Sequence, residues 1–142
     1  MSPVETIVRF ARTSPARRAL LAEVGWTLML ARAAVRWRPF RDAIGFGAIA
    51  LGPRRNIDSG TVVAAVETVS ARVPWRSVCF DQGLAVQRAL RRRGRDARLH
   101  FGLSPPREGP LEAHVWIVLE GQIIIGGEQA DGHQPVAVFP AD

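Results

Sequence analysis

The spacing of apolar residues predicts helices in the first half of the chain. From residue 15 to residue 37, apolar positions recur every three or four residues, which is the period of one helical face. Ser14 is a suitable N-cap for this helix, and Pro15 fits the first helical position because its missing N–H is not needed there. The residues that share the expected apolar face are Leu20, Val24, Leu28, Ala31 and Val35.

Two further helices are predicted downstream. One begins at Asp58 or Ser59, either of which can cap it, and ends before Pro74. The other spans residues 79–93 and ends at Gly94, since glycine readily adopts the left-handed conformation that closes a helix. One narrow stripe of this second helix should face the core or a sheet, and its members are Cys79, Gly83, Val86 and Leu90.

In the last third of the chain the hydrophobic period changes to two, which predicts strands. Apolar and polar residues alternate over 97–103 and 113–119. Residues 120–121, Glu-Gly, suit a two-residue turn that returns the chain as a third strand over 122–127. A last short strand is expected over 136–139. Helices followed by an antiparallel sheet indicate an α+β fold.

The length of the chain, 142 residues, suits about one domain. We expect a helical N-terminal region, residues 1–70, to pack on a core formed by residues 71–142, so that the two make one compact domain.

All 19 basic residues are arginines, and the formal net charge is +6. Without lysine the chain cannot form a lysine-dependent phosphate loop or a Schiff base, so we expect no bound nucleotide and no cofactor. A dense arginine run over residues 91–95 falls at a predicted helix end, where cations complement the helix dipole. This placement favours a solvated helix terminus over a nucleic-acid surface.

The sequence also predicts a cytoplasmic protein. Its first residues lack the basic-then-apolar order of a signal peptide. The apolar run from Leu20 to Val35 is interrupted by Glu23 and Arg32, so it is too short and too polar to span a membrane. Cys79 is the single cysteine, so an internal disulfide is excluded.

Cys79 lies where a helix begins, and this is the position in which a thiol becomes a nucleophile. Free N–H groups and the helix dipole there favour the thiolate. His114 lies on a predicted strand against which that helix should pack, so it can act as the base. Taken singly, each residue is more simply a core residue; together they favour thiol chemistry. A metal site from these two residues with His100 and His133 lacks the usual paired spacing.

The segments WRSVCFDQGLAVQRALRRRGRDARLHFGL and EAHVWIVLEGQIIIGG carry a family resemblance. Over residues 60–140 the chain resembles the leader peptidases of lasso-peptide biosynthesis, a branch of the transglutaminase-like cysteine peptidase superfamily. The resemblance implies a transglutaminase- or papain-like core, with the nucleophile at a helix N-terminus packed on a small antiparallel sheet. It also implies a cytoplasmic cysteine endopeptidase that removes the leader from a ribosomally made precursor peptide.

The partners implied by this resemblance are the precursor peptide and a macrolactam-forming, ATP-dependent cyclase. A winged-helix leader-recognition protein is implied as well, and we expect it to be a separate chain because residues 1–70 do not have the pattern of such a module. No metal and no nucleic acid are implied. The alternative is an inactive scaffold of the same fold that binds the precursor or the cyclase.

The resemblance also implies a third catalytic residue, typically an aspartate on the strand after the histidine strand. A regular hairpin about the predicted turn puts Gly127 opposite His114, and neither residue 126 nor residue 127 is a carboxylate. Glu128 is the nearest candidate to orient the histidine, and Asp131 and Glu120 are alternatives. We therefore predict the catalytic set to be Cys79, His114 and Glu128.

Three aromatic residues of the helical region, Trp26, Trp37 and Phe40, have two open interpretations. They could anchor a docking surface for a partner protein, with nearby arginines at its rim, or they could lie in the core.

Overall fold

The computed structural model describes residues 2–75, 79–103, 113–127 and 134–141, and it has the predicted α+β fold. Helices precede a four-stranded antiparallel sheet of strand order β3-β2-β1-β4. The helices are α1 (Pro3–Arg12), α2 (Pro15–Trp37), α3 (Phe40–Gly47), α4 (Ser59–Ser70) and α5 (Cys79–Arg92). The strands are β1 (Arg98–Leu103), β2 (Ala113–Leu119), β3 (Gln122–Ile125) and β4 (Gln134–Phe139).

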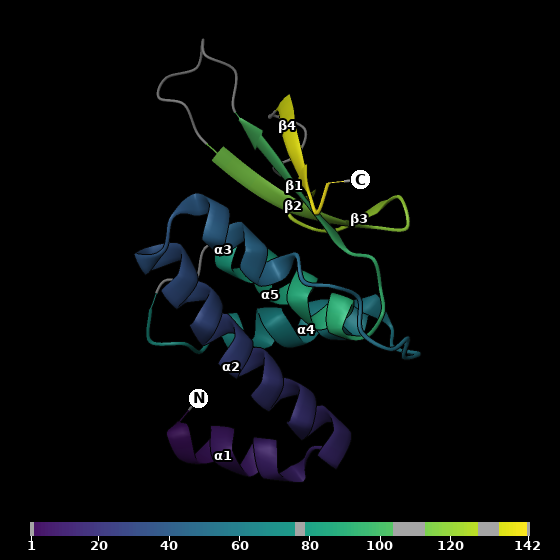
Figure 1. Cartoon of the computed structure of the whole chain (residues 1–142). Helices are drawn as coiled ribbons and strands as arrows, with labels where there is room; N and C mark the ends of the chain where they lie inside the picture. The colour runs from purple at the N-terminus through teal and green to yellow at the C-terminus, as the bar shows by residue number, and fades with distance from the viewer. Residues whose placement is uncertain (1, 76–78, 104–112, 128–133, 142) are drawn as a thin grey trace.

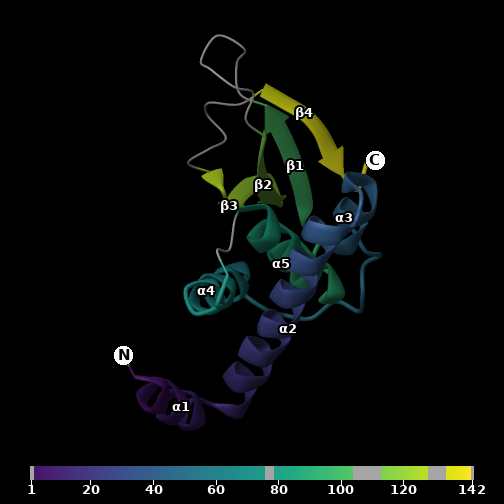
Figure 2. The ribbon, with the colours of Figure 1, turned by 90° about the vertical axis from the view of Figure 1, so that its left-hand side faces the viewer.

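The sheet lies above the helices (Figure 1), and α5 packs against β1 and β2. In the rotated view α5 lies between the sheet and α2 and α4, and α1 lies at the end of α2 away from the sheet (Figure 2). Residues of α2, α3, α4, α5 and the strands share one hydrophobic cluster. The division at residue 70 stays a prediction, but helices on both sides of it contribute to this cluster.

Helix α2 forms as its sequence predicts. The Oγ of Ser14 accepts a hydrogen bond from the backbone N–H of Arg17 at 3.3 Å. The expected apolar face packs into the core, with Val35 only partly buried and Leu20, Val24, Leu28 and Ala31 buried. No helix among the described residues has both the length and the apolar content needed to cross a membrane.

The predicted stripe of α5 faces the core at Gly83, Val86 and Leu90, but burial extends to nearly all sides of the helix. It contacts α2, α3 and α4 as well as the sheet, and its buried residues include Leu84, Ala85 and Ala89 outside the predicted stripe. Gly83 lets α5 approach β2 closely, since a Cβ there would lie 3.3 Å from Cγ2 of Val115. Helix α5 is therefore the central element of the fold.

The arginine run at the end of α5 makes ion pairs within the chain. Arg92 and Arg93 each form an ion pair with Glu23 of α2 at 2.6 Å. Arg91 pairs with Asp96 at 2.6 Å. Three arginines of the run are thus paired with carboxylates of this chain, and Arg91 is buried rather than solvated.

The hairpin of β2 and β3 has the predicted turn but not the predicted register. Glu120 and Gly121 have φ values of 52° and 80°, which match a two-residue turn with both central residues left-handed. The pairing then shifts at a bulge between Ile117 and Val118, so that Ile117 lies opposite Ile125 instead of Ile124. Placing Gly127 opposite His114 assumed a regular hairpin, and that assumption was wrong.

The three aromatic residues of the helical region are exposed, so the interpretation that buries them is wrong. The exposed fractions are 60% for Trp26, 78% for Trp37 and 47% for Phe40. The Phe40 ring still contacts the rings of Phe101 and Phe80, with centroid distances of 5.2 and 6.0 Å. The two tryptophans of α2 therefore lie on its outer surface.

Gly94→Ala is expected to lower the free energy of unfolding by about 3 kcal/mol, because two costs add. Gly94 has φ +72°, and a Cβ there would lie 2.5 Å from the Cα of Arg54. Gly121→Ala is the matched control, since Gly121 has φ +80° but a Cβ there would meet no atom within 4 Å. The control should lose only about 1 kcal/mol in urea denaturation. Equal losses in the two variants would contradict the role of the Arg54 contact.

Candidate active site

The structure brings Cys79 and His114 together. Cys79 is the first residue of α5, and its Sγ lies 3.6 Å from Nδ1 of His114. Both side chains are half-buried, so the contact is shielded but still reachable. The first N–H groups of a helix have no intrahelical acceptor, and they favour negative charge on a sulfur or oxygen at this position.

His114 enters the site from the beginning of β2. It lies opposite Gly102 of β1. Residues opposite each other in a sheet share a face, so a glycine opposite leaves room for the imidazole. Val115, the next residue, packs against Gly83 of α5. The histidine and its neighbour thus both contact α5, at its first and second turns.

A cleft of about 400 Å³ opens beside the thiol. Cys79, Gln82 and Gly83 line it from α5, and Glu67 lines it from α4. The opposite wall consists of five consecutive residues, 123–127. Neighbouring residues of a strand point to opposite faces, so a consecutive run along a wall means that the strand edge borders the cleft. His114 contacts the thiol without being a lining residue of this cleft.

The periodicity of the sequence did not point to three polar residues near the thiol. Glu67 and Gln82 line the cleft, and Asp81 lies fully buried in the first turn of α5. Arg32 Nη1 lies 4.0 Å from the Asp81 carboxylate. The signal that could have indicated Asp81 is its place in a first helical turn, where acidic residues are favoured.

His100 is placed apart from Cys79. It lies opposite Trp116, with ring centroids 5.9 Å apart, two residues further along the strands than the Gly102–His114 pair. Partial burial lowers the pKa of His100, and the charge of Arg98 lowers it further. His133 lies outside the described residues. Within the described ranges, no three histidine, cysteine or acidic residues group as metal ligands.

The structure separates Glu120 from the candidate site. Glu120 lies in the turn at the far end of β2 from His114, about 20 Å away at roughly 3.4 Å per residue. Its carboxylate pairs with Arg95 at 3.3 Å. Glu120 is therefore not positioned to orient the histidine. Glu128 and Asp131 lie outside the described residues.

Comparison with known protein families gives one match. The family model described as the transglutaminase-like superfamily matches residues 24–138, which include α5, the Cys79–His114 pair and all of the sheet except the last residue of β4. A search of curated proteins found no match, and a search of solved structures found none.

Proposed function

The chain belongs to the transglutaminase-like superfamily, and from this premise we propose that it is a cysteine endopeptidase that removes the leader from a lasso precursor peptide. The superfamily includes cysteine peptidases. The observation that carries the proposal is the 3.6 Å contact between Cys79 Sγ and His114 Nδ1 beside an open cleft. The resemblance of residues 60–140 to lasso leader peptidases supports the choice of substrate.

The proposed reaction uses the two residues in turn. His114 takes the thiol proton, and Sγ of Cys79 attacks the carbonyl carbon of the scissile peptide bond. The C–N bond breaks, His114 gives the proton to the leaving amine, and the leader remains bound as a thioester. Water then loses a proton to His114 and hydrolyses the thioester, which frees the leader carboxylate and restores the thiol. Free N–H groups in the first turn of α5 would stabilise the oxyanion.

The bordering strand edge supports a peptide substrate. Among the described strands β3 lies at an edge of the sheet, so one of its sides has backbone N–H and C=O groups that pair with no described strand. An extended peptide can pair with such an edge, which would lay its backbone beside Cys79. The amine product is a core peptide with a free α-amino group, which a macrolactam-forming cyclase requires.

Glu128 remains our proposal for the residue that orients His114, with Asp131 as the alternative. The bulge has already moved the pairing by one residue at Ile117. This shift removes the argument that Gly127 occupies the position opposite the histidine. A triad can also tolerate loss of its orienting residue better than loss of its nucleophile.

The proposal is tested by combining the protein with candidate precursor, recognition protein and cyclase. Mass spectrometry should detect an intact leader fragment that appears only when this chain is present. ATP should be required for ring closure but not for release of the leader. If no leader is released under conditions in which the recognition protein binds the precursor, the inactive-scaffold alternative is favoured.

We further propose that the outer face of α2 binds the recognition protein. Trp26, Met29 and Trp37 are exposed there, and their spacing places them on one side of the helix. Arg36, also exposed, lies beside them and adds positive charge at the rim. A recognition protein that holds the leader would deliver the scissile bond to Cys79 at high effective concentration.

Trp37→Ala is expected to weaken association with the recognition protein by about 30-fold, the effect typical of a tryptophan at an interface centre. The free energy of unfolding should change little, because this side chain is 78% exposed. Leu51→Ala, which truncates an exposed apolar residue outside α2, is the control and should bind normally. Calorimetric titration gives the affinities, and an unchanged value for the tryptophan variant would contradict docking on this face.

A further inference from the structure

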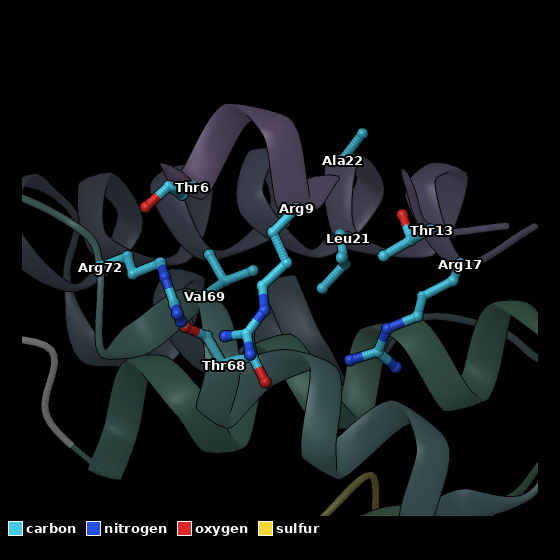
Figure 3. A pocket seen from close by; sticks show the side chains of 9 residues that line it. All are labelled: Thr6, Arg9, Thr13, Arg17, Leu21, Ala22, Thr68, Val69 and Arg72. Atoms are coloured by element: carbon cyan, nitrogen blue, oxygen red, sulfur yellow. The ribbon is translucent and has the colours of Figure 1, made fainter. Parts of the chain in front are cut away.

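A second cavity lies between α1, α2 and α4, remote in sequence from the thiol. Its volume is about 520 Å³. Leu21, Ala22 and Val69 give it an apolar floor, and Arg9, Arg17 and Arg72 bring three guanidinium groups to it. Figure 3 shows the Arg9 side chain between those of Arg72 and Arg17, reaching from α1 towards α4. We call this cavity the arginine groove.

Two of these arginines have no acidic partner among the described residues. The ion pairs formed by described residues include none with Arg9 or Arg17, and both side chains are exposed. Arg72 donates from Nη1 to the carbonyl oxygen of Thr68 at 3.2 Å. The arginines at the end of α5 differ, because they form ion pairs with carboxylates of this chain. The arginine groove therefore has positive charge available for a ligand.

We propose that the arginine groove binds an acidic segment of the peptide substrate, an inference that rests on the proposed function. A guanidinium group can donate two parallel hydrogen bonds to one carboxylate, so Arg9 and Arg17 suit aspartate or glutamate side chains. The aliphatic floor at Leu21 and Val69 suits an apolar side chain between two acidic ones. A nucleic acid would be attracted by the same charges, but its charged phosphate backbone would gain nothing from contact with the apolar residues of the floor.

The position of α4 links the arginine groove to the active site. Glu67 of α4 lines the cleft beside Cys79, whereas Thr68 and Val69 of the same helix line the groove, with Arg72 just after the helix. One helix thus separates the two cavities, and a helix is about 10 Å in diameter. An extended chain covers this distance in about three to four residues. The acidic segment should therefore lie at least that far from the scissile bond.

The test measures binding without cleavage. The probe is a fluorescein-labelled peptide of repeated Glu-Glu-Leu units, and fluorescence anisotropy in about 50 mM salt gives its affinity for the full chain. The double variant Arg9→Gln/Arg17→Gln should bind the probe roughly tenfold more weakly, because two exposed charge pairs are lost. The matched control, Arg12→Gln/Arg18→Gln, changes the same charge on the same two helices outside the groove and should bind as the wild type does.

Three results would overturn the arginine groove as an acidic-peptide site. These are equal weakening in both double variants, equal affinity for a probe of Lys-Lys-Leu units, or tighter binding of a labelled oligothymidylate than of the acidic probe. Because anisotropy does not depend on the thiol, any of them leaves the peptidase proposal standing. Failure of leader release, with probe binding as expected, would instead reject the peptidase proposal. The arginine groove would still be an acidic-peptide site.

Discussion

Cys79→Ala is expected to abolish leader release while leaving a folded protein. Without Sγ no thioester can form, and loss of a nucleophile in comparable triads lowers kcat by roughly 10⁶-fold. The free energy of unfolding should change little, because the substitution removes one sulfur atom from a half-buried residue at the first position of α5. Mass spectrometry of the leader fragment and urea denaturation measure the two effects separately.

The chemistry of the wild-type chain supplies the control for this variant. Cys79 is the single cysteine, so iodoacetamide can label only one thiol. One added carboxamidomethyl group should accompany complete loss of leader release, and the Cys79→Ala variant should take up none. Leader release at the wild-type rate by the alanine variant would mean that the thiol is not the nucleophile and that the peptidase proposal is wrong.

Local rules were enough to predict several elements. Ser14 and Pro15 marked the start of α2, and Gly94 marked the end of α5. The Glu120–Gly121 turn was predicted from two residues because few residue pairs accept two positive φ values. In each case the deciding interaction lies within about four residues along the chain, so that one short segment contains it.

Features set by packing between distant segments were not predictable in the same way. The burial of α5 on nearly all sides depends on α2, α3 and α4 packing around it. The bulge at Ile117 brings both Ile124 and Ile125 against the hydrophobic cluster, which alternation along β3 alone would not do. The pairing of β4 with β1 likewise depends on contacts across about 35 residues of chain, and apolar periodicity does not specify a strand's partner.

In the candidate site, one feature could be predicted from the sequence and another could not. The contact between Cys79 and His114 follows from a helix start packed on the strand that contains the histidine, and both elements were predictable. Assignment of the orienting residue depended on the exact register of the β2–β3 hairpin, which one inserted residue changes. The structure removes Glu120 from consideration, because it pairs with Arg95 at the other end of β2. Glu128 therefore stays a prediction.

His114→Ala is expected to lower the rate of leader release by on the order of 10³-fold, since a general base contributes about 10² to 10⁴ to such reactions. The imidazole is the group whose Nδ1 lies 3.6 Å from Sγ, so its removal leaves the thiol proton without an acceptor. His100→Ala is the matched control: it removes the same ring from the neighbouring strand, beside Trp116 and apart from the thiol, and should leave the rate unchanged.

The comparison of these two histidine variants decides which histidine performs the chemistry. If His100→Ala is inactive and His114→Ala is active, the contact with Cys79 has no catalytic role. Added imidazole should partly restore the His114→Ala variant, because the lost base leaves space opposite Gly102, and it should not restore Cys79→Ala. In the same assay Glu128→Gln should reduce the rate less than His114→Ala does, and Glu120→Gln should not reduce it, because orienting a base contributes less than being the base.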